Sequence, residues 1–173
     1  LLRAADRVSE ETKVRKIIRL LEERFSDQSV LLFTEYKATQ ALVMSALNQR
    51  FGDGCVTFIN GDDAIDDVVS ATGATQVWRR NRDNAADAFN SGEARFLVST
   101  EAAGEGRDLQ RHCHCLIHVD LPWNPMRLHQ RVGRINRYGQ TEPVEVVTLR
   151  NPETVDAKIW EKLNEKIGRI NET

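Results

Sequence analysis

Three arginines recur at intervals of three residues in the C-terminal half of this sequence, and they carry its clearest chemistry. They are Arg131, Arg134 and Arg137 in the run QRVGRINR, which begins at Gln130. On a helix this spacing directs side chains toward one side. A guanidinium is always charged, and its planar fork of donors matches phosphate oxygens. The row therefore predicts either a polyphosphate-binding helix face or a solvated face held by salt bridges.

Gly133 lies inside this row and favours the phosphate interpretation. Glycine in a helix interior costs about 1 kcal/mol relative to alanine, so it usually has a reason such as a close approach of the backbone to a ligand. The helix should start after the run Asp120-Leu-Pro-Trp-Asn-Pro125. Two prolines make that run a rigid turn, and we expect Trp123 within it to be a core residue.

A glycine-rich segment, Gly104-Glu-Gly-Arg-Asp108, follows an apolar run of strand length at 94–100. Two close glycines permit tight backbone approach. Asp108 could cap this turn or accept a hydrogen bond from a ribose hydroxyl. A dinucleotide-binding fingerprint needs a third glycine, which Leu109-Gln110 does not supply, and this disfavours a stand-alone Rossmann enzyme.

The run His112-Cys113-His114-Cys115 contains residue types that ligate metals. Zinc motifs usually separate paired ligands by two or more residues, and alternate side chains of a strand point to opposite faces. We therefore expect the start of a buried strand here and no metal site. The chain has three cysteines, an odd number that provides no disulfide framework and favours a reducing compartment.

The composition indicates one soluble globular domain. The chain has 173 residues, of which 40% are hydrophobic and 29% charged, and its net charge is −2. That charge argues against a wholly basic nucleic-acid-binding surface but permits a local basic patch. No apolar run approaches 18 residues, so we expect no membrane span and a cytoplasmic location. The chain begins without Met inside a charged helical pattern, so we expect it to be a piece of a longer protein.

Apolar strands alternate with helical patterns along the chain. This alternation predicts a parallel sheet covered on both faces, with ligand-binding groups at the carboxyl ends of the strands. The acidic segment 61–75 reads as a loop. Helices are expected at 10–25 (capped by Ser9), 37–50, 76–90 and 153–171, strands at 29–34, 56–60, 94–100, 115–120 and 144–149, and the polar strand ends at Thr34, Asn60, Thr100 and Asp120.

A nucleotide-holding loop is missing from the sequence. No GxxxxGK[ST] motif occurs, and no DExx run ends a strand. Phosphate-directed arginines without a P-loop predict that the P-loop lies on another domain, toward which these arginines reach. An arginine finger of this kind contributes roughly 10³–10⁵ in rate in comparable NTPases.

The segment from Ser99 to Gln140 resembles the helicase C-terminal, or second RecA-like, lobe of superfamily 2 helicases and translocases. Ser99 to Asp108 is similar to motif V, and Gln130 to Arg137 is similar to motif VI in the form QRxGRxxR. DLPWNP followed by QRVGRINRYGQ resembles the Swi/Snf-like branch, and within it the bacterial RapA (HepA)-type proteins. Residues 29–34 fit the motif IV strand, and the resemblance covers most of residues 10–170.

The resemblance implies a RecA-like three-layer α/β sandwich with a mostly parallel sheet. Residues 1–173 would form one helicase C-terminal domain with 153–171 as a C-terminal brace helix, and the first ATPase lobe would be absent from the chain. ATP and Mg²⁺ would be held mainly by that first lobe. The resemblance implies catalytic roles for Arg134 and Arg137, ATP binding by Gln130, Arg131, Gly106 and Asp108, and contact with the nucleic-acid backbone by Thr34 and Thr100.

The implied activity is ATP-driven translocation on double-stranded DNA, in which ATP closes the two lobes and hydrolysis reopens them. The implied partners are nucleic acid, the first lobe and possible remodelled complexes such as RNA polymerase, in a bacterial nucleoid-associated setting without a membrane. The alternative is a catalytically silent RecA-like lobe that serves as a protein-binding module. A P-loop and a DExx strand end upstream of this sequence would distinguish the enzyme from the module.

Overall fold

The computed structural model of the chain describes residues 2–100, 108–122 and 124–149. Within the first helix, side chains are described from Glu10 onward. The predictions for Gly106, for Trp123 and for the helix at 153–171 lie outside the described residues.

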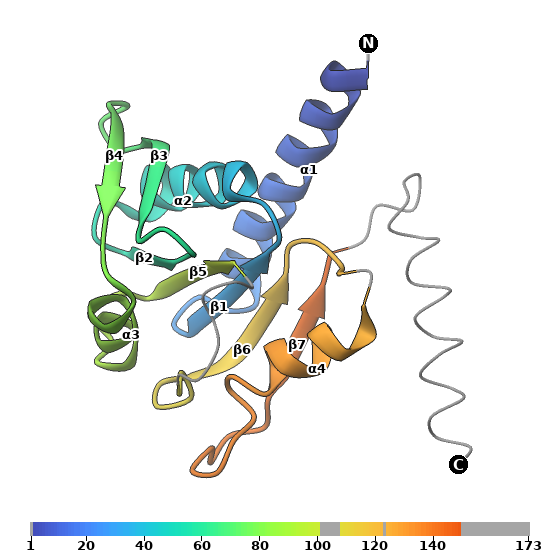
Figure 1. Ribbon diagram of the computed structural model, residues 1–173, viewed down its shortest axis with the longest axis vertical. Coiled ribbons are helices and arrows are strands. Elements are labelled where there is room, and N and C mark those ends of the chain that lie inside the picture. The colour runs from blue at the N-terminus through green and yellow to red at the C-terminus, as the bar shows by residue number, and fades with distance from the viewer. Residues whose placement is uncertain (1, 101–107, 123, 150–173) are drawn as a thin grey trace.

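A five-stranded sheet forms the centre of the fold, and each of its strand pairings is parallel (Figure 1). The strand order is β2-β5-β1-β6-β7. The central strands are almost completely buried, as expected for continuous apolar runs covered from both sides. The strands are β1 (Ser29–Thr34), β2 (Val56–Ile59), β5 (Phe96–Thr100), β6 (Cys113–His118) and β7 (Glu145–Thr148).

Side chains of the sheet alternate between two apolar clusters, one on each face. Leu32 packs in a cluster with the helices α1 (Leu2–Glu23) and α2 (Lys37–Phe51). Its neighbour Leu31 packs on the other face in a cluster that includes Phe89 of α3 (Arg82–Asn90). The two clusters confirm the predicted α/β sandwich, with a mostly parallel sheet and helices on both faces. Burying each of these side chains contributes about 1.5–3 kcal/mol.

The acidic segment is not a loop, which corrects the prediction for 61–75. It contains β3 (Ala64–Val69), which pairs with β4 (Thr75–Arg79) as an antiparallel hairpin. The register shifts between Ile65 and Val68, both of which are buried against α2, and Asp67 between them has φ of +60°. This bulge breaks the two-residue alternation from which a strand is recognised in a sequence, so the pattern is hidden.

The helix expected at 76–90 starts only at Arg82, because residues up to Arg79 belong to β4. Asn81 caps the shorter helix, and its side chain accepts a hydrogen bond from the Asn84 amide at 2.9 Å. Trp78 therefore lies on the hairpin. At the N-terminus α1 begins at Leu2, so Ser9 lies inside the helix and is not its cap; the preceding Leu and Ala residues are strong helix formers.

Candidate functional site

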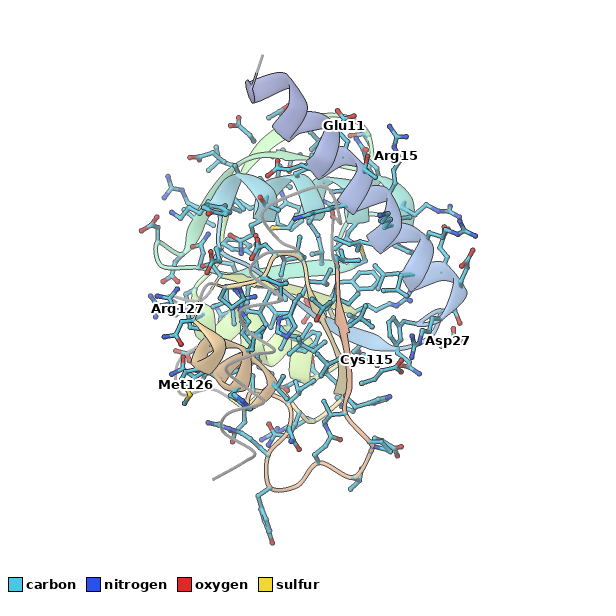
Figure 2. The ribbon with its side chains drawn as sticks, turned by 90° about the vertical axis from the view of Figure 1, so that its right-hand side faces the viewer. Glu11, Arg15, Asp27, Cys115, Met126 and Arg127 are labelled. Atoms are coloured by element: carbon cyan, nitrogen blue, oxygen red, sulfur yellow. The ribbon has the colours of Figure 1, made fainter. Side chains whose placement is uncertain are left out.

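The helix α4 (Pro125–Val132) begins at the carboxyl edge of the sheet, shortly after β6 ends. Asn124 caps it, since its side chain accepts a hydrogen bond from the Met126 amide at 3.0 Å. Pro125 takes the first helical position, where its missing N–H costs nothing. Met126 and Arg127 lie on the outer side of α4 (Figure 2). The predicted start of the arginine-rich helix is thus confirmed.

The helix ends at Val132, which corrects the prediction that three arginines share one helical face. Gly133 is the C-terminal cap, and residues 134–139 after it form turns and bends. A Cβ added at Gly133 would lie 3.2 Å from the His129 carbonyl oxygen. The glycine is therefore explained by crowding at a helix end, and it is not in a helix interior. Only Arg131 of the three arginines belongs to α4.

Arg131 is buried, with 2% of its surface exposed. Its Nη1 donates to the Asp120 carbonyl oxygen at 2.9 Å, and its Nη2 lies 3.7 Å from the Asp120 carboxylate. The guanidinium also stacks over the Phe33 ring, 5.4 Å from its centroid. A buried cation needs such partners. Arg131 therefore joins α4 to the sheet, and its expected role in nucleotide binding stays a prediction.

His118 lies next to this guanidinium at the end of β6, with its Nδ1 3.4 Å from Arg131 Nη1. Burial, together with the nearby positive charge of Arg131, lowers the pKa of His118 to about 3. A neutral imidazole can accept a hydrogen bond from the guanidinium. His118 is thus an uncharged acceptor inside the cluster and not a cation at neutral pH.

Asp120 occupies the centre of the same cluster. Its carboxylate accepts a hydrogen bond from the Thr34 hydroxyl at 2.5 Å and from the Glu35 amide at 3.0 Å. Burial raises the pKa of Asp120, while the hydrogen bonds from Thr34 and Glu35 and the charge of Arg131 oppose that shift. The carboxylate therefore connects the carboxyl ends of β1 and β6 with α4.

The nucleic-acid contact expected of Thr34 stays a prediction, and the structure shows which bonds this residue already makes. The residue is 0% exposed, and its hydroxyl already donates to Asp120. It cannot contact a phosphate without giving up that bond. Thr100 pairs with Thr34 in the register of β5 against β1 and is also buried. The two threonines lie at the same sheet edge, as expected from parallel strands.

Arg137 and Asp108 form an ion pair on the surface. Both side chains are accessible, with 38% and 61% of their side-chain surface exposed. The backbone brings the two segments together as well, because the Leu109 amide donates to the Arg134 carbonyl oxygen at 3.3 Å. Surface ion pairs of this kind are worth about 0–1 kcal/mol. A ligand with more negative charge can therefore displace Asp108 from Arg137 at small cost.

Gln130 lies on α4, and Arg134 lies in the turn that follows the helix. The Gln130 side chain is exposed on α4, and Arg134 is half-buried in the first turn after the helix. Arg134 is tied to the helix end, since its amide donates to the Arg131 carbonyl oxygen at 3.1 Å. The placement of Arg134 thus depends on the placement of Arg131. From the sequence, Asp120 is expected at this edge without a role of its own, and no sequence pattern distinguishes His118.

The cysteines of the His-Cys-His-Cys run lie in β6. Burial raises the pKa of the Cys113 thiol to about 12 and that of Cys115 to about 11, so neither is readily ionised. Within the described ranges, no three His, Cys, Asp or Glu side chains gather as a metal site would require. None of the helices described here has the length and apolar character needed to cross a membrane.

Comparisons with known proteins agree with this fold. The family model of the helicase conserved C-terminal domain matches residues 12–139. The chain is 36% identical over 162 residues to the uncharacterized ATP-dependent helicase YqhH of Bacillus subtilis (strain 168), covering 94% of this chain and 26% of that protein. It is 27% identical over 165 residues to the RNA polymerase-associated protein RapA of Vibrio campbellii, covering 94% of this chain and 15% of RapA.

Among solved structures, the C-terminal part of the Fun30 ATPase domain superposes with a TM-score of 0.68 at 21% identity. The match covers 86% of this chain and 44% of that one, and it supports the RecA-like α/β fold. The chain spans about a quarter or less of the two sequence relatives. It belongs to the helicase conserved C-terminal domain family, as a second RecA-like lobe of the Swi/Snf-like branch of superfamily 2.

Proposed function

We propose that this chain is the second motor lobe of a DNA-dependent ATPase, in which Arg134 and Arg137 act as arginine fingers. The observation that carries the proposal is the position of Arg137. Its guanidinium is accessible, and its partner Asp108 is itself exposed and readily displaced. An accessible arginine beside a half-buried second one suits a γ-phosphate that is presented by another domain.

ATP and Mg²⁺ would be held mainly by a first RecA-like lobe that carries the P-loop. The relatives named above are several times longer than this chain, which leaves room for such a lobe in them. On closure of the two lobes, Gln130 would lie beside the phosphates. Asp108 would leave Arg137 and accept a hydrogen bond from the ribose. One displacement would thus free the finger and supply a nucleotide contact.

The nucleic-acid partner in this proposal is double-stranded DNA, tracked without strand separation. Contact would occur at the carboxyl edge of β1 and β5, where Thr100 ends its strand. Thr34 would act there indirectly, through its bond to Asp120. Backbone contacts of this type make binding insensitive to sequence and strongly dependent on salt.

A second candidate function is a docking module without catalysis. It is favoured by the relative that is named as RNA polymerase-associated, and its partner would be RNA polymerase or another remodelled complex. The two proposals differ in whether Arg137 is needed for ATP turnover. A module would bind its partner equally well when that arginine is removed.

The test is ATP hydrolysis by a protein that contains this chain together with a P-loop lobe, with and without duplex DNA. Arg137→Ala should lower DNA-stimulated kcat by about 10³-fold or more, as removal of an arginine finger does. The matched control is Arg19→Ala, because Arg19 also forms an exposed ion pair, with Glu23 on α1. The control should keep wild-type turnover, and an Arg137→Ala variant that also keeps it would refute the motor assignment.

A further inference from the structure

The carboxylate of Asp120 has two groups of partners that belong to different segments of the chain. From the end of β1, the Thr34 hydroxyl and the Glu35 amide donate to it. From α4, the Arg131 guanidinium faces it at 3.7 Å. Side-chain exposure is 14% for Asp120 and 2% for Arg131, so water replaces little of either interaction. One buried acidic group therefore holds β1 and α4 against each other.

The arrangement is sensitive to loss of that charge. When one member of a buried ion pair is removed, the other is left as an uncompensated buried charge, and the local structure must rearrange to hydrate it. At the rim of the same junction Arg127 lies 3.7 Å from Glu35 and is half exposed, so that ion pair is weak. Arg131 Nη1 also donates to the backbone carbonyl oxygen of Asp120 at 2.9 Å, so the backbone and the carboxylate of Asp120 both contribute to seating α4 on β1.

A shift of α4 would change the positions of the two arginines that are proposed as fingers. The amide of Arg134 is bonded to the carbonyl oxygen of Arg131, and the carbonyl oxygen of Arg134 is bonded to Leu109 next to Asp108. Any change in the seating of Arg131 is therefore passed on to Arg134 and to the segment that bears Arg137. Arginines that act on a reacting phosphate must be held at a defined position, and reaction rates fall steeply when such a group is misplaced.

We propose that Asp120 is a positioning residue that couples the nucleic-acid edge at the end of β1 to the arginine segment after α4. It touches neither nucleotide nor nucleic acid. DNA bound at this edge would displace the segment of Thr34 and Glu35. The shared carboxylate would transmit that displacement to Arg131. The inference rests on the proposed motor function, and it adds the residue through which DNA binding changes the arginine geometry.

The activity test uses Asp120→Asn, which keeps the side-chain size and removes the charge, in a protein that joins this chain to a P-loop lobe. At saturating DNA, the stimulated kcat should fall by about tenfold to a hundredfold, as a misplaced group does. The KM for ATP should change little, because Asp120 does not touch ATP. Glu145→Gln is the matched control, as it removes another carboxylate paired with an arginine, Arg24, at the start of β7.

A pair of variants at Thr34 separates coupling from direct DNA contact. Thr34→Val removes the hydroxyl that donates to Asp120, whereas Thr34→Ser keeps it. Coupling predicts that Thr34→Val lowers the stimulated kcat at saturating DNA, whereas Thr34→Ser keeps it near the wild-type value. It also predicts that Thr34→Val adds little to the effect of Asp120→Asn. A change in DNA affinity alone, or an additive double variant, would overturn the inference.

A second measurement does not need activity. Amide hydrogen exchange on this chain should become faster in Asp120→Asn at 34–36 and 125–136, with β2 and α3 unchanged. Uniform acceleration, or none, would show that Asp120 does not link these segments. If the wild-type protein shows no DNA-stimulated hydrolysis, the motor function fails, whereas the exchange pattern still decides whether Asp120 couples the two segments.

Discussion

Replacing Arg131 by methionine should destabilise the fold mainly through the carboxylate that it leaves behind. Methionine keeps much of the packing over Phe33 and removes the charge that faces Asp120. Breaking a buried ion pair by removing one partner typically costs about 3–5 kcal/mol. Asp120 keeps its hydrogen bonds from Thr34 and Glu35, so the lower part of that range is expected at neutral pH.

The pH dependence of this loss has a defined sign. Burial already raises the pKa of Asp120 in the wild type, and Arg131 opposes the shift. Without Arg131 the pKa rises further, so the folded variant binds a proton more readily than the unfolded chain does. The cost of Arg131→Met is therefore largest above the raised pKa of Asp120. It shrinks as the pH falls from there toward the ordinary aspartate value of about 3.9.

The assay is urea unfolding of wild type and variant at neutral and mildly acidic pH, with melting temperature as a second readout. For a domain of this size, each 1 kcal/mol corresponds to about 2–4 °C. The variant Asp120→Asn/Arg131→Met should be less destabilised than the sum of its single variants, because no unpaired charge remains. A loss below about 1 kcal/mol at neutral pH would refute the argument that this pair is desolvated. Strict additivity would refute it as well.

Two further predictions concern stability. The folded pKa of His118 is lowered to about 3, so the unfolded chain binds more protons between that value and about 6.5. The contribution of neutral His118 to the free energy of unfolding should therefore be fully present above about pH 6.5 and fall by up to about 1.4 kcal/mol per pH unit below it. His118→Gln should flatten this slope in urea unfolding measured across pH. An unchanged slope would contradict the lowered pKa of His118. Asn81→Ala removes the cap of α3 and should cost about 1 kcal/mol in urea unfolding, while Asn81→Asp should keep most of it. Equal stability of these two Asn81 variants would show that the cap contributes nothing.

The parallel sheet and most of its helices could be predicted because their signals are local. Continuous apolar runs such as 29–34 and 96–100 match buried strands, and the helix at 37–50 is confirmed within one residue. The hairpin at 64–79 could not be predicted in this way. Its bulge places Ile65 and Val68 on the same buried side, where they pack against α2, a contact that no local pattern contains.

The candidate site shows the same division. The residue types and spacing of QRVGRINR by themselves predicted phosphate-directed arginines, and the motifs determined the family of the chain. Only the tertiary structure decided which of these arginines is buried and which is accessible. Arg131 is buried because its partners Phe33 and Asp120 come from strand ends that are far apart in the sequence. Arg137 stays accessible because the helix ends before it, and where a helix ends over a sheet depends on packing that no local pattern contains.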